Sequence, residues 1–290
     1  MHDRLSPLRL IEPPPPALRA LVHYFHVECP APGAHQLPAS PFPILVLVAS
    51  GATAMQRGGT PLLSGCEAYL AGPFTAPHQY LAAPGTAFVA ALLRPGVAQD
   101  LFGIDQRTLR DGAWPLTEVA SGRTLVPVLD ALRVSDVSRW PALAGDWLLR
   151  VQAQRPCVGR RLQLAHFHEP PRLLARRHGL GLRQFERRFA ARYGLSPRQA
   201  IRLVRFTRAL SALMSGGHRG LADLALRMGY YDQAQMGRDF IALAGHSPGL
   251  LAAPPADAGL EIFRYRAAEL HAIQHCERNE TLLAMPTASG

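Results

Sequence analysis

The sequence predicts an α+β fold in which a β-rich half precedes a helical half. Between Leu8 and Leu93 the chain has short apolar runs bounded by Pro and Gly, a pattern typical of strands in a small barrel or sandwich. After Pro95 the apolar residues recur at three- and four-residue spacings, which indicates amphipathic helices. The arginines also concentrate in the helical half.

The β-rich half contains five runs that we expect to be strands. They are rich in Val, Tyr and Phe, and turn residues separate them. In order they read LVHYFHV, FPILVLVAS, CEAYLAG, HQYLAA and TAFVAALL.

Helices are predicted from Gly96 onward. GVAQDLFGI is the first helical segment, and the spacings of Leu125, Leu129 and Leu132 and then of Trp147, Leu148 and Val151 predict two longer helices. From Gln163 to about Leu251 the pattern is helical throughout. It is broken at Pro170 and Pro171, Gly179 to Gly181, Gly194 to Pro197, Gly216 and Gly217, Gly229, and Gly245 to Pro248.

These shifts in pattern divide the chain into four regions. Residues 1–110 are expected to form a β-rich domain and residues 111–156 a helical connector. Residues 157–253 are expected to form an all-α domain of helix-turn-helix units, and residues 254–290 a last helix with a frayed tail.

The positive charge is confined to one segment. Residues 151–250 hold 17 arginines and five acidic residues, a net charge of +12, whereas the rest of the chain carries −2 and the whole chain +10. Such a segment favours a polyanionic partner, and double-stranded DNA is the partner we expect. A solvated helical surface in an Arg-rich protein is the alternative.

Two stretches of the basic segment form an internal repeat: Arg172 to Pro197 and Gly220 to Pro248. Each has a Leu-Ala helix, a Gly turn, a polar helix with Phe near its end, and a closing Gly-x-Ser-Pro. In the second copy Asp232 is predicted to cap the polar helix. The amphipathic helix between the copies should fix their distance, so that the two polar helices enter successive major grooves roughly 34 Å apart.

The exposed faces of the polar helices are suited to reading bases. Phe185 and Phe189 would pack inward in the first copy, as would Met236 and Phe240 in the second. Arg pairs with guanine edges and Gln with adenine edges in the major groove. The base-reading candidates are Arg183, Glu186, Arg187, Gln233, Ala234, Gln235 and Arg238. Phosphate contacts are expected from Arg176, Arg177, Arg188, Arg202 and Arg205.

About 90 residues of this segment resemble the double helix-turn-helix domain of the AraC/XylS family of bacterial transcription regulators. The resemblance rests on the following residues: Leu174, Ala175, Leu180, Phe185, Arg188, Phe189, Gly194, Ser196, Pro197, Arg205 and Ala209, then Leu224, Ala225, Gly229, Tyr230, Asp232, Arg238, Phe240, Gly245, Ser247 and Pro248. It implies sequence-specific DNA binding, control of transcription in the cytoplasm, and contact with RNA polymerase. The pattern differs at Gly181, where the family has a capping Ser, at Met236, and at Gly237 inside the second polar helix.

The N-terminal half resembles, less specifically, the cupin-like sensor domains of the same family. HYFHV, LPASPFPILVLVASG, AGPFTAPHQY and VAALLRPGVAQDLFGI carry this resemblance, which implies a small-molecule effector or a homodimer. An interior lined by Phe74, His78, Tyr80 and Phe88 would suit an apolar or aromatic effector.

Nothing in the sequence makes a positive case for an enzyme or a cofactor. A metal-binding barrel needs clustered His and Glu, whereas His78 stands alone, and His166, His168 and Glu169 are neighbours too few to complete a site. The four cysteines are widely spaced, which indicates reduced thiols, and no apolar run is long enough to span a membrane.

The sequence therefore predicts a DNA-binding transcription regulator that is not an enzyme and holds no metal. Two alternatives remain open, a non-specific architectural DNA-binding protein and a cupin-type metal enzyme. Base-face substitutions that weaken all DNA sequences alike would favour the first, and stoichiometric metal in the purified protein would favour the second.

Overall fold

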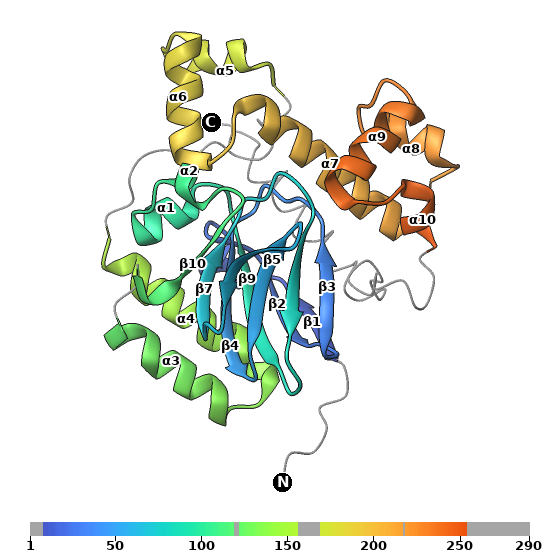
Figure 1. The fold of residues 1–290 in the computed structure, drawn as a ribbon. Helices are drawn as coiled ribbons and strands as arrows, with labels where there is room; N and C mark the ends of the chain where they lie inside the picture. Colours follow the sequence, from blue (N-terminus) through green and yellow to red (C-terminus); the bar gives the residue numbers. More distant parts are fainter. Residues whose placement is uncertain (1–7, 119–121, 156–168, 217, 254–290) are drawn as a thin grey trace.

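The computed structural model describes residues 8–118, 122–155, 169–216 and 218–253 (Figure 1). Two antiparallel sheets and the helices that cover one of them make up the N-terminal part, and six helices make up the C-terminal part. The order of elements confirms the predicted α+β class. The predicted last helix within residues 254–290 and the residues His166 and His168 lie outside the described residues.

The first sheet has six strands, all antiparallel to their neighbours. Its spatial order is β1-β2-β9-β4-β7-β10. The strand bounds are β1 Leu8–Glu12, β2 Val22–Cys29, β9 Ala87–Leu93, β4 Ile44–Ser50, β7 Ala68–Ala71 and β10 Ala113–Pro115.

The second sheet has four antiparallel strands in the order β3-β8-β5-β6. Their bounds are β3 Gly33–Leu37, β8 His78–Ala82, β5 Thr53–Arg57 and β6 Thr60–Ser64. All five strands predicted from the sequence are present as β2, β4, β7, β8 and β9.

Both faces of the first sheet are buried, which explains the nearly continuous apolar sequence of its central strands. Successive side chains of a strand point to opposite faces. Val46 and Val48 of β4 accordingly join the core between the two sheets, whereas Leu45 and Leu47 join the core under the helices.

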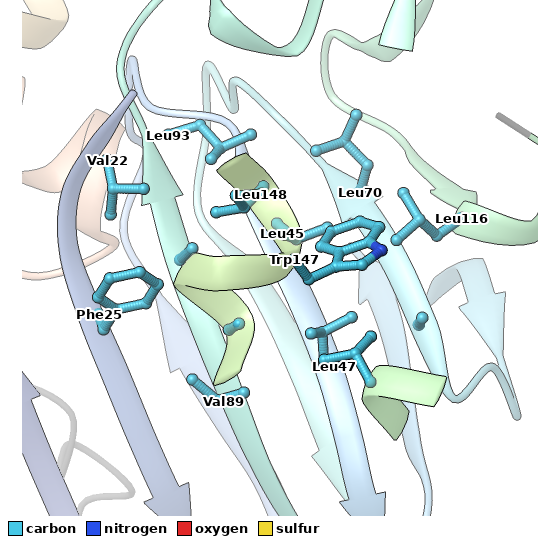
Figure 2. Close-up of a cluster of buried hydrophobic side chains, with 14 of the residues drawn as sticks. Val22, Phe25, Leu45, Leu47, Leu70, Val89, Leu93, Leu116, Trp147 and Leu148 are labelled. Atoms are coloured by element: carbon cyan, nitrogen blue, oxygen red, sulfur yellow. The ribbon is translucent and has the colours of Figure 1, made fainter. Parts of the chain in front are cut away.

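Helices of the segment after Pro95 cover the outer face of the first sheet. They are α1 Val97–Phe102, α2 Gln106–Leu109, α3 Gly122–Val134 and α4 Trp140–Ala153. Trp147 of α4 is fully buried over the strands, among Phe25, Leu45, Leu70 and their neighbours (Figure 2). The helices α3 and α4 thus belong to the core of the first sheet, although the sequence assigned them to a connector over residues 111–156. The four-part division of the chain itself stays a prediction.

Within residues 169–216 and 218–253 the structure has six helices, whose bounds match the predicted Gly and Pro breaks. They are α5 Pro171–Arg177, α6 Leu182–Tyr193, α7 Pro197–Ser215, α8 Leu221–Arg227, α9 Gln233–Ala244 and α10 Pro248–Ala252. The long helix α7 separates the pair α5 and α6 from the group α8, α9 and α10, and it lies beside one end of the two sheets (Figure 1). None of the described helices is both long and apolar enough to cross a lipid bilayer.

Candidate DNA interface

The first helix-turn-helix unit consists of α5 and α6. Phe185, Phe189 and Tyr193 of α6 are buried and form a ladder of ring contacts, with centroids 5.7 Å and 4.5 Å apart along the helix. On the opposite face Arg183 and Arg187 are exposed and Glu186 is half-buried. Gly181 precedes the helix and makes no side-chain cap. The predicted inward and outward faces of α6 are therefore present.

The second unit consists of α8 and α9, and α9 begins with a side-chain cap. The Asp232 carboxylate accepts a hydrogen bond of 2.6 Å from the backbone N–H of Gln235. The Gln235 side-chain oxygen in turn accepts from the backbone N–H of Tyr231 at 2.8 Å. These bonds satisfy backbone donors that the first turn of a helix leaves unpaired.

The side chains of α9 divide as the sequence predicts. Met236 and Phe240 are fully buried, and Gln233, Ala234 and Arg238 are exposed. Gln235 is half-buried, and its oxygen is engaged at the helix start. The exposed set stands on the first two turns of α9, as Arg183 and Arg187 do on α6.

Of the five arginines predicted to contact phosphate, two are exposed and have no ion pair among the described residues. These are Arg176 and Arg188. Arg177 is also exposed, but its Nη1 lies 2.5 Å from Glu169 Oε1.

The other two arginines of that set converge on one acid. Arg202 and Arg205 of α7 reach Asp239 of α9, with Nε to Oδ1 at 2.7 Å and Nη2 to Oδ2 at 3.3 Å. The Arg205 guanidinium also lies 4.4 Å from the centroid of the Tyr230 ring, a cation–π distance. Burial, and then the Asp239 carboxylate, raise the pKa of Tyr230 to about 12. This cluster ties α9 to α7.

Sequence reasoning did not single out Asp239, although a signal was present. Met236, Asp239 and Leu243 share the inward face of α9 at helical spacing, and Asp239 is only 7% exposed. A carboxylate at a core position needs a cationic partner. That requirement predicts a cationic partner for Asp239, but it does not say which arginines supply it.

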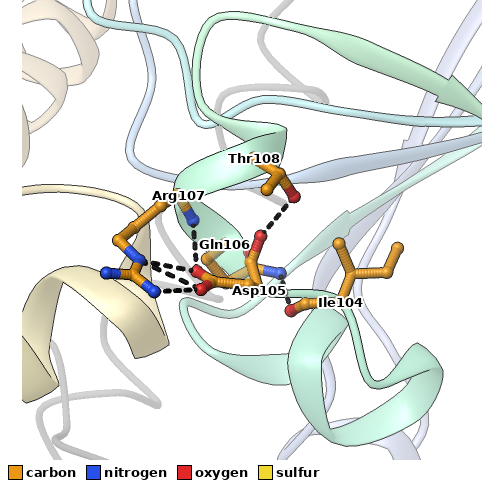
Figure 3. A network of polar contacts seen from close by, with 5 residues as sticks. All are labelled: Ile104, Asp105, Gln106, Arg107 and Thr108. Carbon is orange, nitrogen blue, oxygen red and sulfur yellow. Dashed lines mark hydrogen bonds and ion pairs between the residues drawn. The ribbon is translucent and has the colours of Figure 1, made fainter.

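The N-terminal part holds both reading helices at their C-terminal ends. At α6, Arg192 pairs with Asp100 at 2.9 Å, and a Cβ placed on Gly194 would lie 2.5 Å from the carbonyl oxygen of Gln106. Gln106 is the first residue of α2, and Asp105 caps this helix. The Asp105 carboxylate accepts from the backbone N–H of Arg107 and forms an ion pair with the Arg107 side chain (Figure 3). That hydrogen bonding lowers the pKa of the Asp105 carboxyl.

At α9 the contact comes from the second sheet and the residues after it. The Gln36 amide donates to the carbonyl oxygen of Ala244 at 3.1 Å, and the backbone N–H of Ala39 donates to that of Leu243 at 2.7 Å. The two contacts fall at the Gly that closes each copy of the repeat, Gly194 and Gly245. Sequence patterns cannot reveal them because backbone groups make much of the contact.

The residues predicted to line an effector pocket lie in the core between the sheets. Phe74 and His78 stack with ring centroids 3.6 Å apart, and Tyr80 meets Phe88 edge-on at 5.8 Å. Tyr80 and Phe88 line a cavity of about 60 Å³ inside the sandwich. His78 lines a second cavity of about 140 Å³ that extends to α7.

No group of three or more His, Cys, Asp or Glu side chains among the described residues is placed to hold a metal ion. Cys29 and Cys66 are free thiols in the part of the chain that the structure describes. Burial raises the pKa of both thiols.

Comparisons with known proteins agree with this geometry. Residues 174–253 match the family model of a helix-turn-helix domain. This segment is therefore a helix-turn-helix domain, a kind of domain that binds DNA. The predicted resemblance is confirmed for this segment, which is an AraC-type helix-turn-helix domain, the DNA-binding domain of a transcription regulator.

Several solved structures are similar to this chain at low sequence identity. ToxT from Vibrio cholerae O395 is 9% identical, with a TM-score of 0.41, over 79% of this chain and 96% of that one. ToxT from Vibrio cholerae strain SCE256 with a bound unsaturated fatty acid is 10% identical, with a TM-score of 0.42, over 87% of this chain and 97% of that one. The AraC-like transcriptional activator CuxR is 14% identical, with a TM-score of 0.32, over 87% and 82%. No curated protein is significantly similar in sequence.

Proposed function

We propose that the chain reads a bipartite DNA site with α6 and α9. The observation that carries this proposal is the repeated geometry of the two helices, each with its aromatic or Met side buried and its cationic or amide side exposed in the first two turns. A reading helix that enters the major groove contacts base edges with its N-terminal residues. The base contacts would come from Arg183, Glu186, Arg187, Gln233, Ala234, Gln235 and Arg238.

The remaining arginines of the segment supply affinity rather than selectivity in this proposal. Arg176, Arg177 and Arg188 contact phosphates, which hold the protein on the duplex without reading its sequence. Arg202 and Arg205 act indirectly, because both are engaged with Asp239 in the structure.

In this proposal the N-terminal part regulates how the two helices read DNA, and the protein acts in the cytoplasm. Its hydrogen bonds and ion pair to the ends of α6 and α9 support such coupling. A small-molecule effector that contacts the N-terminal part, a second copy of the chain, and RNA polymerase are the further partners we propose.

Selection of bound sequences from a random DNA pool tests the proposal. The full-length protein should select two half-sites about one helical turn apart, and the preference should persist when the salt concentration is raised. Selection that is blind to sequence and lost at higher salt would refute it in favour of an architectural DNA-binding protein.

Two single substitutions on α6 separate base reading from phosphate binding. Arg187→Ala should relax the preference at one or two positions of a half-site, by about 1–3 kcal/mol per base pair. The matched variant Arg188→Ala should weaken all sequences alike and reduce the salt dependence by about one phosphate. Equal effects of the two variants on every sequence would contradict the assignment of Arg187.

A further inference from the structure

The larger cavity lies between the N-terminal sheets and the helix that joins the two reading units. Its volume is about 140 Å³. Ile11, His23 and Phe42 contribute to one wall, and Thr207, Leu210 and Ser211 of α7 contribute to the other. A molecule bound here would therefore contact both parts of the chain at once.

The size of the cavity limits the occupant to one ring. An engineered apolar cavity of about 150 Å³ holds benzene, so a cavity of about 140 Å³ suits a six-membered ring with a small substituent. It adjoins the smaller cavity of about 60 Å³, with which it shares His26, Leu37, Ile44 and Leu92. A substituent could extend in that direction.

The polar groups in the wall are hydroxyl, phenol and imidazole groups. They are the hydroxyls of Ser40, Thr207 and Ser211, the phenol of Tyr24 and three imidazoles. The Thr207 hydroxyl donates to the carbonyl oxygen of Leu203 at 2.9 Å, which leaves its oxygen as an acceptor for a ligand O–H. The wall can therefore pair with one neutral hydrogen-bonding group.

The described wall of the cavity offers no Arg or Lys to neutralise an anionic ligand and no Asp or Glu to neutralise a cationic one. None of the described residues that line the cavity is Arg, Asp or Glu, and the chain contains no Lys. The acid Glu28 lines the adjoining cavity, and its carboxylate lies 3.4 Å from His26 Nε2. A buried anion without a cation loses its hydration and gains no partner.

The imidazole of His78 strengthens this conclusion. It is 2% exposed and stacks on Phe74. Burial lowers the pKa of His78 to about 3, so the ring is neutral at physiological pH and offers no positive charge to an acid.

We infer that this cavity binds a neutral single-ring molecule with one small hydrogen-bonding group, and not a carboxylic acid. The inference deepens the effector role proposed above by naming the class of ligand. It depends on the cavity alone, and its test contains no DNA, so its failure is distinguishable from failure of the DNA-reading proposal.

Four probes of nearly equal size test the chemistry by calorimetric titration of the full-length protein at pH 8. Benzyl alcohol should bind tighter than about 1 mM, and about tenfold more tightly than toluene, benzoate or benzylamine. Benzoate or benzylamine that binds as well as the alcohol would overturn the inference of a neutral ligand. Toluene at equal affinity would overturn the hydrogen-bonding group, and no binding of any probe would overturn the site.

Variants on α7 locate the site. Ser211→Phe should fill the cavity and abolish binding of the alcohol and of toluene, whereas Arg208→Phe, an exposed position on the same helix, should leave both unchanged. The gentler double variant Thr207→Val with Ser211→Ala should keep toluene binding and remove the preference for the alcohol. If the alcohol keeps its preference in that double variant, the hydroxyls of α7 do not contact it and the assignment is wrong.

Discussion

Asp239 provides the sharpest test of how the second reading helix is held. The carboxylate is almost fully buried and accepts from Arg202 at 2.7 Å and from Arg205 at 3.3 Å. A hydrogen bond to a charged group contributes about 1.5–3 kcal/mol. The Arg202 side chain is 45% exposed and that of Arg205 is 28% exposed, so both can turn to water when the acid is removed. We therefore expect Asp239→Ala to cost about 2–3 kcal/mol, the value of one such bond, rather than the sum of two.

The measurement is urea unfolding of the full-length protein followed by circular dichroism, together with hydrogen exchange of the α9 amides. The three Trp residues lie at positions 114, 140 and 147, so Trp fluorescence reports the N-terminal part separately. Asp239→Asn keeps one acceptor and should cost about half as much. Asp130→Ala is the control, because Asp130 pairs with Arg133 on an exposed face and should contribute about 0.5 kcal/mol or less.

One result would refute this reasoning. If Arg202 and Arg205 contact phosphates instead of holding α9, Asp239→Ala should leave stability unchanged within about 0.5 kcal/mol. It should then also tighten binding to every DNA sequence and steepen the salt dependence by up to about two phosphates.

Three further substitutions test the docking, the helix and the buried imidazole. Gly194→Ala should cost more stability than Gly179→Ala. Both glycines have positive φ, but only a Cβ at Gly194 would contact another atom, the carbonyl oxygen of Gln106 at 2.5 Å. Equal losses of stability in thermal unfolding would contradict the contact between Gly194 and Gln106. Gly237→Ala should stabilise the protein by about 0.5–1 kcal/mol, since a Cβ there meets nothing within 4 Å inside a helix, and a lower unfolding midpoint would contradict this expectation. The unfolded chain protonates His78 near pH 6.5 and the folded chain only near pH 3, so stability should fall as pH drops through this window. At pH 5 the loss should be about 2 kcal/mol, and His78→Phe should lack that loss when urea unfolding is compared at pH 7.5 and 5.

The sequence predicts those strands and helices whose own residues are apolar enough to indicate that they are buried. The strands β2, β4, β7, β8 and β9 are rich in Val, Leu, Tyr and Phe, and the sequence predicted all five. The ends of the C-terminal helices could also be predicted, because Gly and Pro residues mark them directly.

Two of the strands that the sequence missed, β3 and β6, depend on pairing with a neighbouring strand. β6 reads TPLLS and is largely exposed, and β3 begins with two exposed residues, Gly33 and Ala34. Each lies at an edge of the second sheet, so pairing with β5 or β8 supplies the order that composition does not. Such long-range pairing leaves no periodic signal in a short segment.

Of the candidate DNA interface, too, one part could be predicted from the sequence and another could not. The faces of α6 and α9 follow from helical periodicity, so the exposed Arg and Gln positions could be predicted. The partners of Arg202 and Arg205 could not, because two exposed-looking arginines on α7 give no sign of an acid 34 to 37 residues further along the chain. The roles of the residues at the DNA remain predictions for the assays above.

Because α6 and α9 are each anchored at the C-terminal end, a small tilt at that end displaces the N-terminal end by a larger distance. The twelve residues of α9 span about 18 Å, with the docked carbonyl groups of Leu243 and Ala244 at one end and Gln233 at the other. A tilt of about 10° at the docked end therefore carries the far end about 3 Å, close to the axial rise of one base pair, about 3.4 Å. The helix α6 is likewise anchored at its own C-terminal end, by Asp100 and Gln106. Sub-ångström shifts around these residues, or around Gln36 at α9, would therefore change the spacing of the two helix N-termini on the DNA, and with it the register between half-sites.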